Sequence, residues 1–135
     1  MTEKQIQKNP IWMQHLLRLA GVYNILWGIW ILIFPFAFFD LCSIARPNYP
    51  EIWQSVGMIV GVYGVGYYIS SYDPYKHWPI IFVGFLGKLF GPIGALFYAL
   101  QGKMDWKFLY INLTNDLIWL IPFSIILVKA YKDKK

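Results

Sequence analysis

Four long apolar segments, separated by short polar connections, constrain the fold of this chain more than any other feature. They cover about residues 16–39, 53–70, 78–100 and 108–128. A bilayer core about 30 Å thick needs roughly 20 helical residues to cross it, and each segment comes close to that length. The alternating pattern of membrane strands is missing, so helices remain as the spanning structure. The sequence predicts an all-α bundle of four transmembrane helices in one integral membrane domain, residues 1–135.

The composition agrees with a chain that lives in a bilayer. Hydrophobic residues make up 58% and charged residues 14% of the chain, whereas soluble domains carry about 25% charged residues. Seven Trp and ten Tyr also suit a chain with two membrane–water interfaces. Most of the Lys and Arg residues that give the net charge of +5 lie near the chain ends. There they are expected to signal the topology and to contact anionic lipid head groups. The expected partner is therefore the lipid bilayer, and no nucleic acid partner is expected.

The distribution of cations predicts the orientation of the bundle. In an antiparallel up-down bundle, the termini and the middle connection share one side of the membrane. Eight cations fall on that side: Lys4, Lys8, Arg18, Lys76, Lys129, Lys132, Lys134 and Lys135. Three fall on the other side: Arg46, Lys103 and Lys107. Because cytoplasmic loops carry the excess of Lys and Arg, both termini are expected in the cytoplasm, with the bundle in a bacterial inner membrane.

Two charged residues lie inside the predicted spans, Lys88 in the third and Asp116 in the fourth. At about 1.5 Å of rise per residue, they lie roughly 15 Å and roughly 18 Å from the same interface. A tight hairpin of these two spans would therefore bring them together near the midplane. Charges at this depth are rare, and by default they mark a functional site.

Further polar residues share a helix face with Asp116. The stripe has the spacing i, i+3, i+4, i+7 and contains Asn112, Asn115, Asp116 and Trp119. Small residues on the third span would let the helices approach closely; they are Gly84, Gly87, Gly91 and Ala95. Asn24, which lies between two glycines of the first span, could join this group.

Two interpretations of these residues stay open, an ion pair that fixes helix register and a polar pocket that binds a ligand or moves a proton. The neighbouring Asn residues, and the carbonyls left free by Pro92 and Pro122, favour the pocket. In such a pocket Lys88 would be the anion or proton partner and Asp116 its counter-charge. The expected hydrogen-bonding groups are Asn24, Asn112 and Asn115, and Trp119 would form an apolar wall.

No catalytic or metal-binding constellation is visible in the sequence. Cys42 is the single cysteine, and His15 and His77 are too far apart to offer metal-ligand spacing. The Gly87-Lys88 pair does not belong to a P-loop, because Leu89 stands where Ser or Thr would hold magnesium. The sequence therefore identifies no cofactor and no metal, and leaves open whether the protein is an enzyme.

Three features together resemble the DoxX-like group of small four-helix bacterial membrane proteins. They are Arg18-Leu19-Ala20-Gly21 at the start of the first span, the glycine-rich second span and the four-span layout. Some members of that group are associated with quinone-linked redox enzymes as membrane subunits. The resemblance implies a role of that kind, and no catalytic residue is carried over from it.

These observations lead to one main hypothesis and two alternatives. The main hypothesis is an inner-membrane protein whose helices enclose a polar pocket, at Lys88 and Asp116, for a small or lipid-like ligand. The first alternative is a small proton-coupled transporter, formed by a homo-oligomer because four short helices leave little room for a path. The second is a membrane subunit of a quinone-linked redox complex or of another complex.

Overall fold

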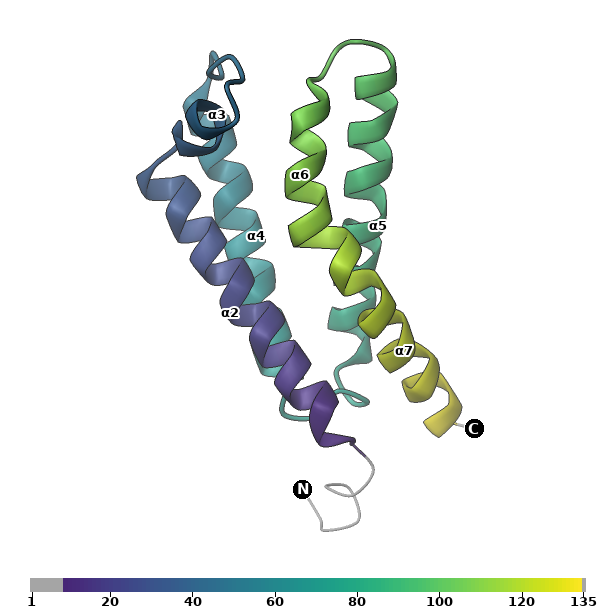
Figure 1. The fold of residues 1–135 in the computed structure, drawn as a ribbon. Coiled ribbons are helices and arrows are strands. Elements are labelled where there is room, and N and C mark those ends of the chain that lie inside the picture. Colours follow the sequence, from purple (N-terminus) through teal and green to yellow (C-terminus); the bar gives the residue numbers. More distant parts are fainter. Residues whose placement is uncertain (1–8, 135) are drawn as a thin grey trace.

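The computed structural model describes residues 9–134, which form helices joined by turns and short loops (Figure 1). The α-helices are α2 (Ile11–Ile33), α3 (Ala37–Leu41), α4 (Pro50–Ser70), α5 (Trp78–Leu100), α6 (Leu109–Asn112) and α7 (Ile118–Asp133). A 3-10 helix, η1 (Trp106–Phe108), precedes α6, and a π-helical segment, η2 (Leu113–Leu117), joins α6 to α7. No strand occurs in residues 9–134, which confirms the all-α class.

Three helical stretches are long and apolar enough to cross a membrane. They are Ile11–Ile33, Trp78–Leu100 and the run Trp106–Asp133, which joins η1, α6, η2 and α7. Many large apolar side chains on these stretches point outward, including Leu26, Phe90 and Ile121. A lipid environment accounts for such exposure, because hydrocarbon tails are as apolar as these side chains. The three stretches indicate an integral membrane protein.

The second predicted span forms the 21-residue helix α4. Four glycines and three tyrosines dilute its apolar content, and α4 is not among the three stretches that qualify by length and composition. The helix begins with Pro50 in its first turn, where the missing N–H of proline removes no hydrogen bond.

Proline also explains where the first helix ends. The predicted segment 16–39 includes Phe34 and Pro35, but α2 ends at Ile33 and the short α3 follows. Phe34 has φ −124° and ψ 70°, which is outside the α-helical region. A residue before proline is pushed out of that region by the proline ring. The first apolar segment is therefore a helix with a break near its end.

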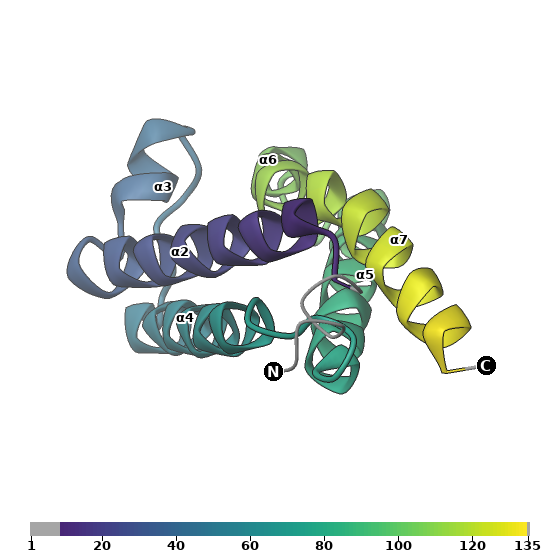
Figure 2. The same ribbon diagram turned by 90° about the horizontal axis from the view of Figure 1, so that it is seen from below.

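The helices associate as two pairs (Figures 1 and 2). One pair is α2 with α4, whose contact is the most extensive in the fold. The other pair is α5 with the run from η1 to α7. The start of α2 and the end of α7 lie at the same end of the molecule. Lys4, Lys8 and Lys135, which contribute to the predicted orientation, lie outside the described residues.

A buried apolar core joins the two pairs in the half of the molecule nearest these ends. Its members come from α2, α4, α5 and α7, and they are Met13, Leu17, Ala20, Tyr67, Ile81, Trp119, Phe123 and Ile126. Because this core holds the two pairs together at one end, the space between the pairs toward the other end need not be filled by packed apolar side chains.

Candidate functional site

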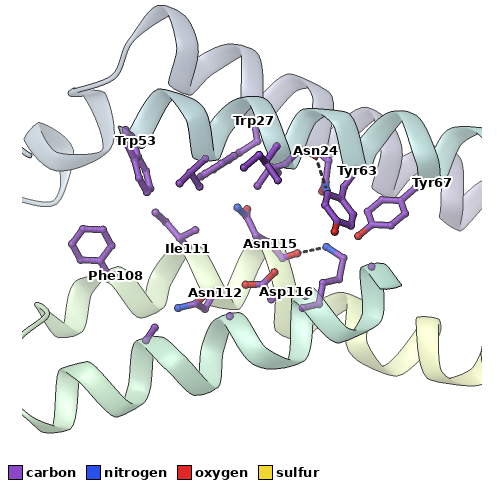
Figure 3. Close-up of a pocket in the computed structure, with 18 of the residues that line it drawn as sticks. Asn24, Trp27, Trp53, Tyr63, Tyr67, Phe108, Ile111, Asn112, Asn115 and Asp116 are labelled. Atoms are coloured by element: carbon purple, nitrogen blue, oxygen red, sulfur yellow. Dashed lines mark hydrogen bonds between the residues drawn. The ribbon is translucent and has the colours of Figure 1, made fainter. Parts of the chain in front are cut away.

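A cavity of about 490 Å³ lies between the two helix pairs (Figure 3). Its wall comes from α2, α4, α5 and the run from η1 to η2. Five of the six residues predicted for the site line it: Asn24, Lys88, Asn112, Asn115 and Asp116. The structure thus brings to one cavity residues that are up to 92 positions apart in the sequence, Asn24 and Asp116. Tyr23, which precedes Asn24 in the chain, is hydrogen-bonded to Asn115.

Lys88 is buried at the boundary between this cavity and the apolar core, with 4% of its surface exposed. Its Nζ donates a hydrogen bond of 2.6 Å to the backbone carbonyl oxygen of Asn115. Nζ also lies 5.3 Å from the ring centre of Tyr67 and 5.7 Å from that of Phe123. Aromatic faces attract cations at such distances. The ammonium group is therefore held by one carbonyl and surrounding rings.

The π-helical segment η2 explains why Asn115 can offer its carbonyl to Lys88. The backbone N–H of Ile118 bonds to the carbonyl of Leu113, five residues earlier, instead of following the i→i−4 pattern. The segment lies just before Pro122, which has no N–H to give. Short π-helical turns inside α-helices occur frequently at functional sites. Here the turn leaves backbone acceptors available to side chains.

Asp116 and Lys88 do not form a direct ion pair, because the Lys88 ammonium is directed to the Asn115 carbonyl. The two charges are still close enough for a Coulomb interaction. The Asp116 carboxylate faces Gly91 of α5, where an added Cβ would lie 3.4 Å from Oδ2 of Asp116 and 3.8 Å from Oδ1 of Asn112. The sequence-based expectation that the charges share one region holds, but the close ion pair is absent.

Two buried polar atoms at the cavity wall lack a hydrogen-bond partner. Asn24 is 3% exposed, and its Nδ2 donates to the carbonyl of Val60 over 3.3 Å, while its Oδ1 has no partner. Nε1 of Trp53 is also buried and unpartnered. Leaving a buried polar group unsatisfied costs about 1–3 kcal/mol. Both residues belong to the cavity wall, but the two atoms themselves present almost no surface to the cavity and are buried within the wall.

Trp119 does not line the cavity, although the sequence pattern placed it on the same face as Asp116. It is 6% exposed, belongs to the apolar core and donates from Nε1 to the carbonyl of Thr114 over 3.0 Å. The π-helical turn η2, which contains Asp116, accommodates an additional residue ahead of Trp119, and one residue corresponds to about 100° of helix rotation. Trp119 is consequently turned away from the cavity.

Sequence reasoning missed the wall that α4 contributes. Ile59 lines the cavity, and the other lining residues of α4 follow a spacing of three and four residues; these are Trp53, Val56, Val60, Tyr63 and Tyr67. This stripe lies beside Gly57, Gly61 and Gly64 on the same helix. The heptad-like spacing of the stripe is a signal that could have identified this wall. Tyr23 was missed too; its hydroxyl donates to Oδ1 of Asn115.

The site contains no group of metal-binding side chains. Within residues 9–134, no cluster of three or more His, Cys, Asp or Glu could hold a metal ion. Comparison with known proteins found no matching family model, no matching curated protein and no matching solved structure. The resemblance to the DoxX-like group, with the quinone-linked role that it implies, therefore stays a prediction.

Proposed function

We propose that this protein binds a small or lipid-like ligand in the cavity between its two helix pairs. The observation that carries the proposal is the convergence on one cavity of two charged side chains, Lys88 and Asp116, with three asparagines. In a bilayer no bulk water reaches such groups, so a bound molecule is their natural partner. The apolar aromatic walls are a further feature that a ligand would contact.

The membrane placement belongs to the same proposal. We propose that α4 crosses the membrane beside α2, which makes the fold an antiparallel four-helix bundle. The length of α4 supports this, since 21 residues at about 1.5 Å each extend roughly 32 Å. Both termini would be cytoplasmic in a bacterial inner membrane, as the cation distribution predicts. The cavity then lies inside the bilayer, where a lipid-like molecule can enter it from the side.

The test of ligand binding uses native mass spectrometry of the protein purified gently from its membrane. Gly87 lines the cavity and has no atom within 4 Å of an added Cβ, so Gly87→Leu places a large side chain in the empty space. Gly94 lies on the same helix, also has no atom within 4 Å, and does not line the cavity. Gly94→Leu is therefore the matched control.

We expect wild type and Gly94→Leu to retain a discrete added mass that Gly87→Leu lacks. Because both variants carry the same Gly-to-Leu change on α5, a difference between them reports on the cavity and not on helix propensity. Bare protein in all three samples, or an added mass that Gly87→Leu keeps, would count against the proposal.

A further inference from the structure

We infer that the ligand is an uncharged amphiphile whose head group both donates and accepts hydrogen bonds, with its hydrocarbon chain lying toward Trp53 and Phe108. This inference rests on the proposed function and specifies the chemical class that the same cavity would take. It follows from three properties of the wall, which are its charge balance, its hydrogen-bonding groups and its apolar end.

The charges of the wall already balance. Lys88 and Asp116 are the charged side chains among the described lining residues, and they carry opposite signs. They interact with each other through space without direct contact. A head group with a net charge would leave one charge uncompensated in a setting where an unpaired buried charge is costly. The cavity therefore favours a ligand without net charge.

The free hydrogen-bonding groups include an acceptor and donors. The acceptor is the carboxylate of Asp116, which lines the cavity beside Gly91. An ammonium group has three donors, and Lys88 gives one of them to the Asn115 carbonyl. A head group that carries hydroxyls can donate to this carboxylate and accept from Lys88.

One end of the cavity is apolar (Figure 3). Trp53 and Phe108 lie at this end, Asn115 and Asp116 lie in the middle, and Asn24 lies toward the end marked by Tyr67. The rings of Trp53 and Phe108 are 6.3 Å apart between centres. A second cavity of about 430 Å³ shares these two residues and Val56 with the first. This end has room and an apolar surface for a hydrocarbon chain.

The second cavity is itself mostly apolar. It lies under the connection that follows α3, and it is lined by Phe39, Ala45, Pro47, Asn48, Tyr49, Ile52, Trp53, Val56 and Phe108. The two cavities are neighbours, since Trp53, Val56 and Phe108 line both of them. An amphiphile with its head at Asp116 would thus meet apolar surface along the whole of its chain.

The experiment compares three probes that share one hydrocarbon chain and differ in head-group charge: monolauroylglycerol, laurate and laurylamine. Each is titrated into the full chain in a mild detergent and its binding is read by native mass spectrometry. Wild type should bind the uncharged monolauroylglycerol at least about tenfold more tightly than either charged probe. Asp116→Asn, which leaves Lys88 unbalanced, should shift the preference to laurate.

Lys88→Met makes the opposite change and should shift the preference to laurylamine. Thermal unfolding checks that each variant is folded. If Lys88→Met is not folded, the probe preference of Asp116→Asn alone tests the inference. Wild type that binds laurate or laurylamine as tightly as monolauroylglycerol, or an Asp116→Asn variant with unchanged preference, would overturn the inference.

The failure of the inference and the failure of the proposed function give different results. If none of the three probes binds but Gly87→Leu still loses a mass retained from the membrane, the cavity binds something of another class and only the inference is wrong. If no probe binds and no retained mass depends on Gly87, both are wrong.

Discussion

The two glycine-bearing helix faces of this protein lead to opposite kinds of packing. Between α2 and α4, an added Cβ on Gly21 would lie 2.7 Å from the carbonyl oxygen of Gly64, and one on Gly64 would lie 2.6 Å from that of Gly21. Real Cβ atoms do not come that close, so the backbones themselves are in contact here. On α5, by contrast, an added Cβ on Gly87 meets no atom within 4 Å.

The comparison shows that glycine can serve two purposes in a membrane bundle. At the α2–α4 interface the missing side chains let two helices touch, which is how helices associate tightly where lipid competes for every apolar surface. At Gly87, on the cavity face of α5, the missing side chain leaves space that no other residue fills, whereas at Gly84 the ring of Tyr67 occupies that space. The first arrangement contributes stability, and the open position at Gly87 adds volume to the cavity.

The largest effect that we predict breaks the first of these arrangements. Gly64→Val would force a branched side chain against the carbonyl of Gly21 and the side chain of Asn24. Overpacking of this kind costs about 1–3 kcal/mol and occasionally more, and contact with backbone leaves little room to relax. We expect a clearly lower thermal unfolding midpoint and a lower yield of monodisperse protein in detergent.

Gly87→Val is the matched control, since it makes the same change to helix propensity at a position with open space around it. We expect its unfolding midpoint to stay near that of wild type. If the two variants lose equal stability, the contrast between a filled and an open glycine face is wrong.

This contrast is the part of the fold that the sequence could not predict. Periodicity identified the stripe of small residues on the third span, and composition marked the second span as glycine-rich, because both signals depend only on the sequence of one helix. Whether a stripe is filled depends on the distance to the neighbouring helix, and that distance is set by all the side chains around it. Thus Gly64 and Gly87 look alike in the sequence and differ by a close backbone contact in the structure.

An intermediate effect is expected where the core meets the cavity, at Trp119. Trp119→Phe keeps an aromatic ring in the core but removes the hydrogen bond from Nε1 to the Thr114 carbonyl. Since an unsatisfied backbone acceptor in this setting costs about 1–3 kcal/mol, we expect a loss near the lower limit. Hydrogen exchange at the backbone N–H groups of η2 should become faster, because this bond helps to hold the π-helical turn.

Trp106→Phe provides the comparison for this variant, as Trp106 is 52% exposed at the start of η1. It should leave hydrogen exchange in η2 unchanged. Equal acceleration in both variants would mean that the indole of Trp119 does not stabilise the turn.

The same turn marks the limit of what depth and spacing could predict about the site. Counting residues from the interface correctly predicted that Lys88 and the 112–116 region meet, and five of the six predicted site residues line one cavity. An ideal helix was assumed, however, and an ideal helix has no π-helical turn. The turn gives Lys88 the Asn115 carbonyl in place of Asp116, and it rotates Trp119 into the core.

The smallest effect is expected at Asp40, in α3, and Arg46, in the connection from α3 to α4. Nε and Nη2 of Arg46 donate to Oδ1 and Oδ2 of Asp40 over 2.9 Å and 2.8 Å, with both side chains about half exposed. These hydrogen bonds hold the pKa of Asp40 below its usual range. The depressed pKa means that the contribution of the pair is present above the usual aspartate range and is lost as the pH falls through the folded-state pKa.

Arg46→Gln should therefore raise the pKa of Asp40 toward its ordinary value, as measured by NMR titration of a selectively labelled aspartate carboxyl. Because exposed ion pairs contribute little to stability, the unfolding midpoint should hardly change. Ligand retention should be unchanged as well, since neither residue lines the first or the second cavity. A loss of retained mass in Arg46→Gln would instead make the connection from α3 to α4 part of the binding site. The molecule would then have a third region, besides the packed interface and the open cavity face, that controls access to the cavity.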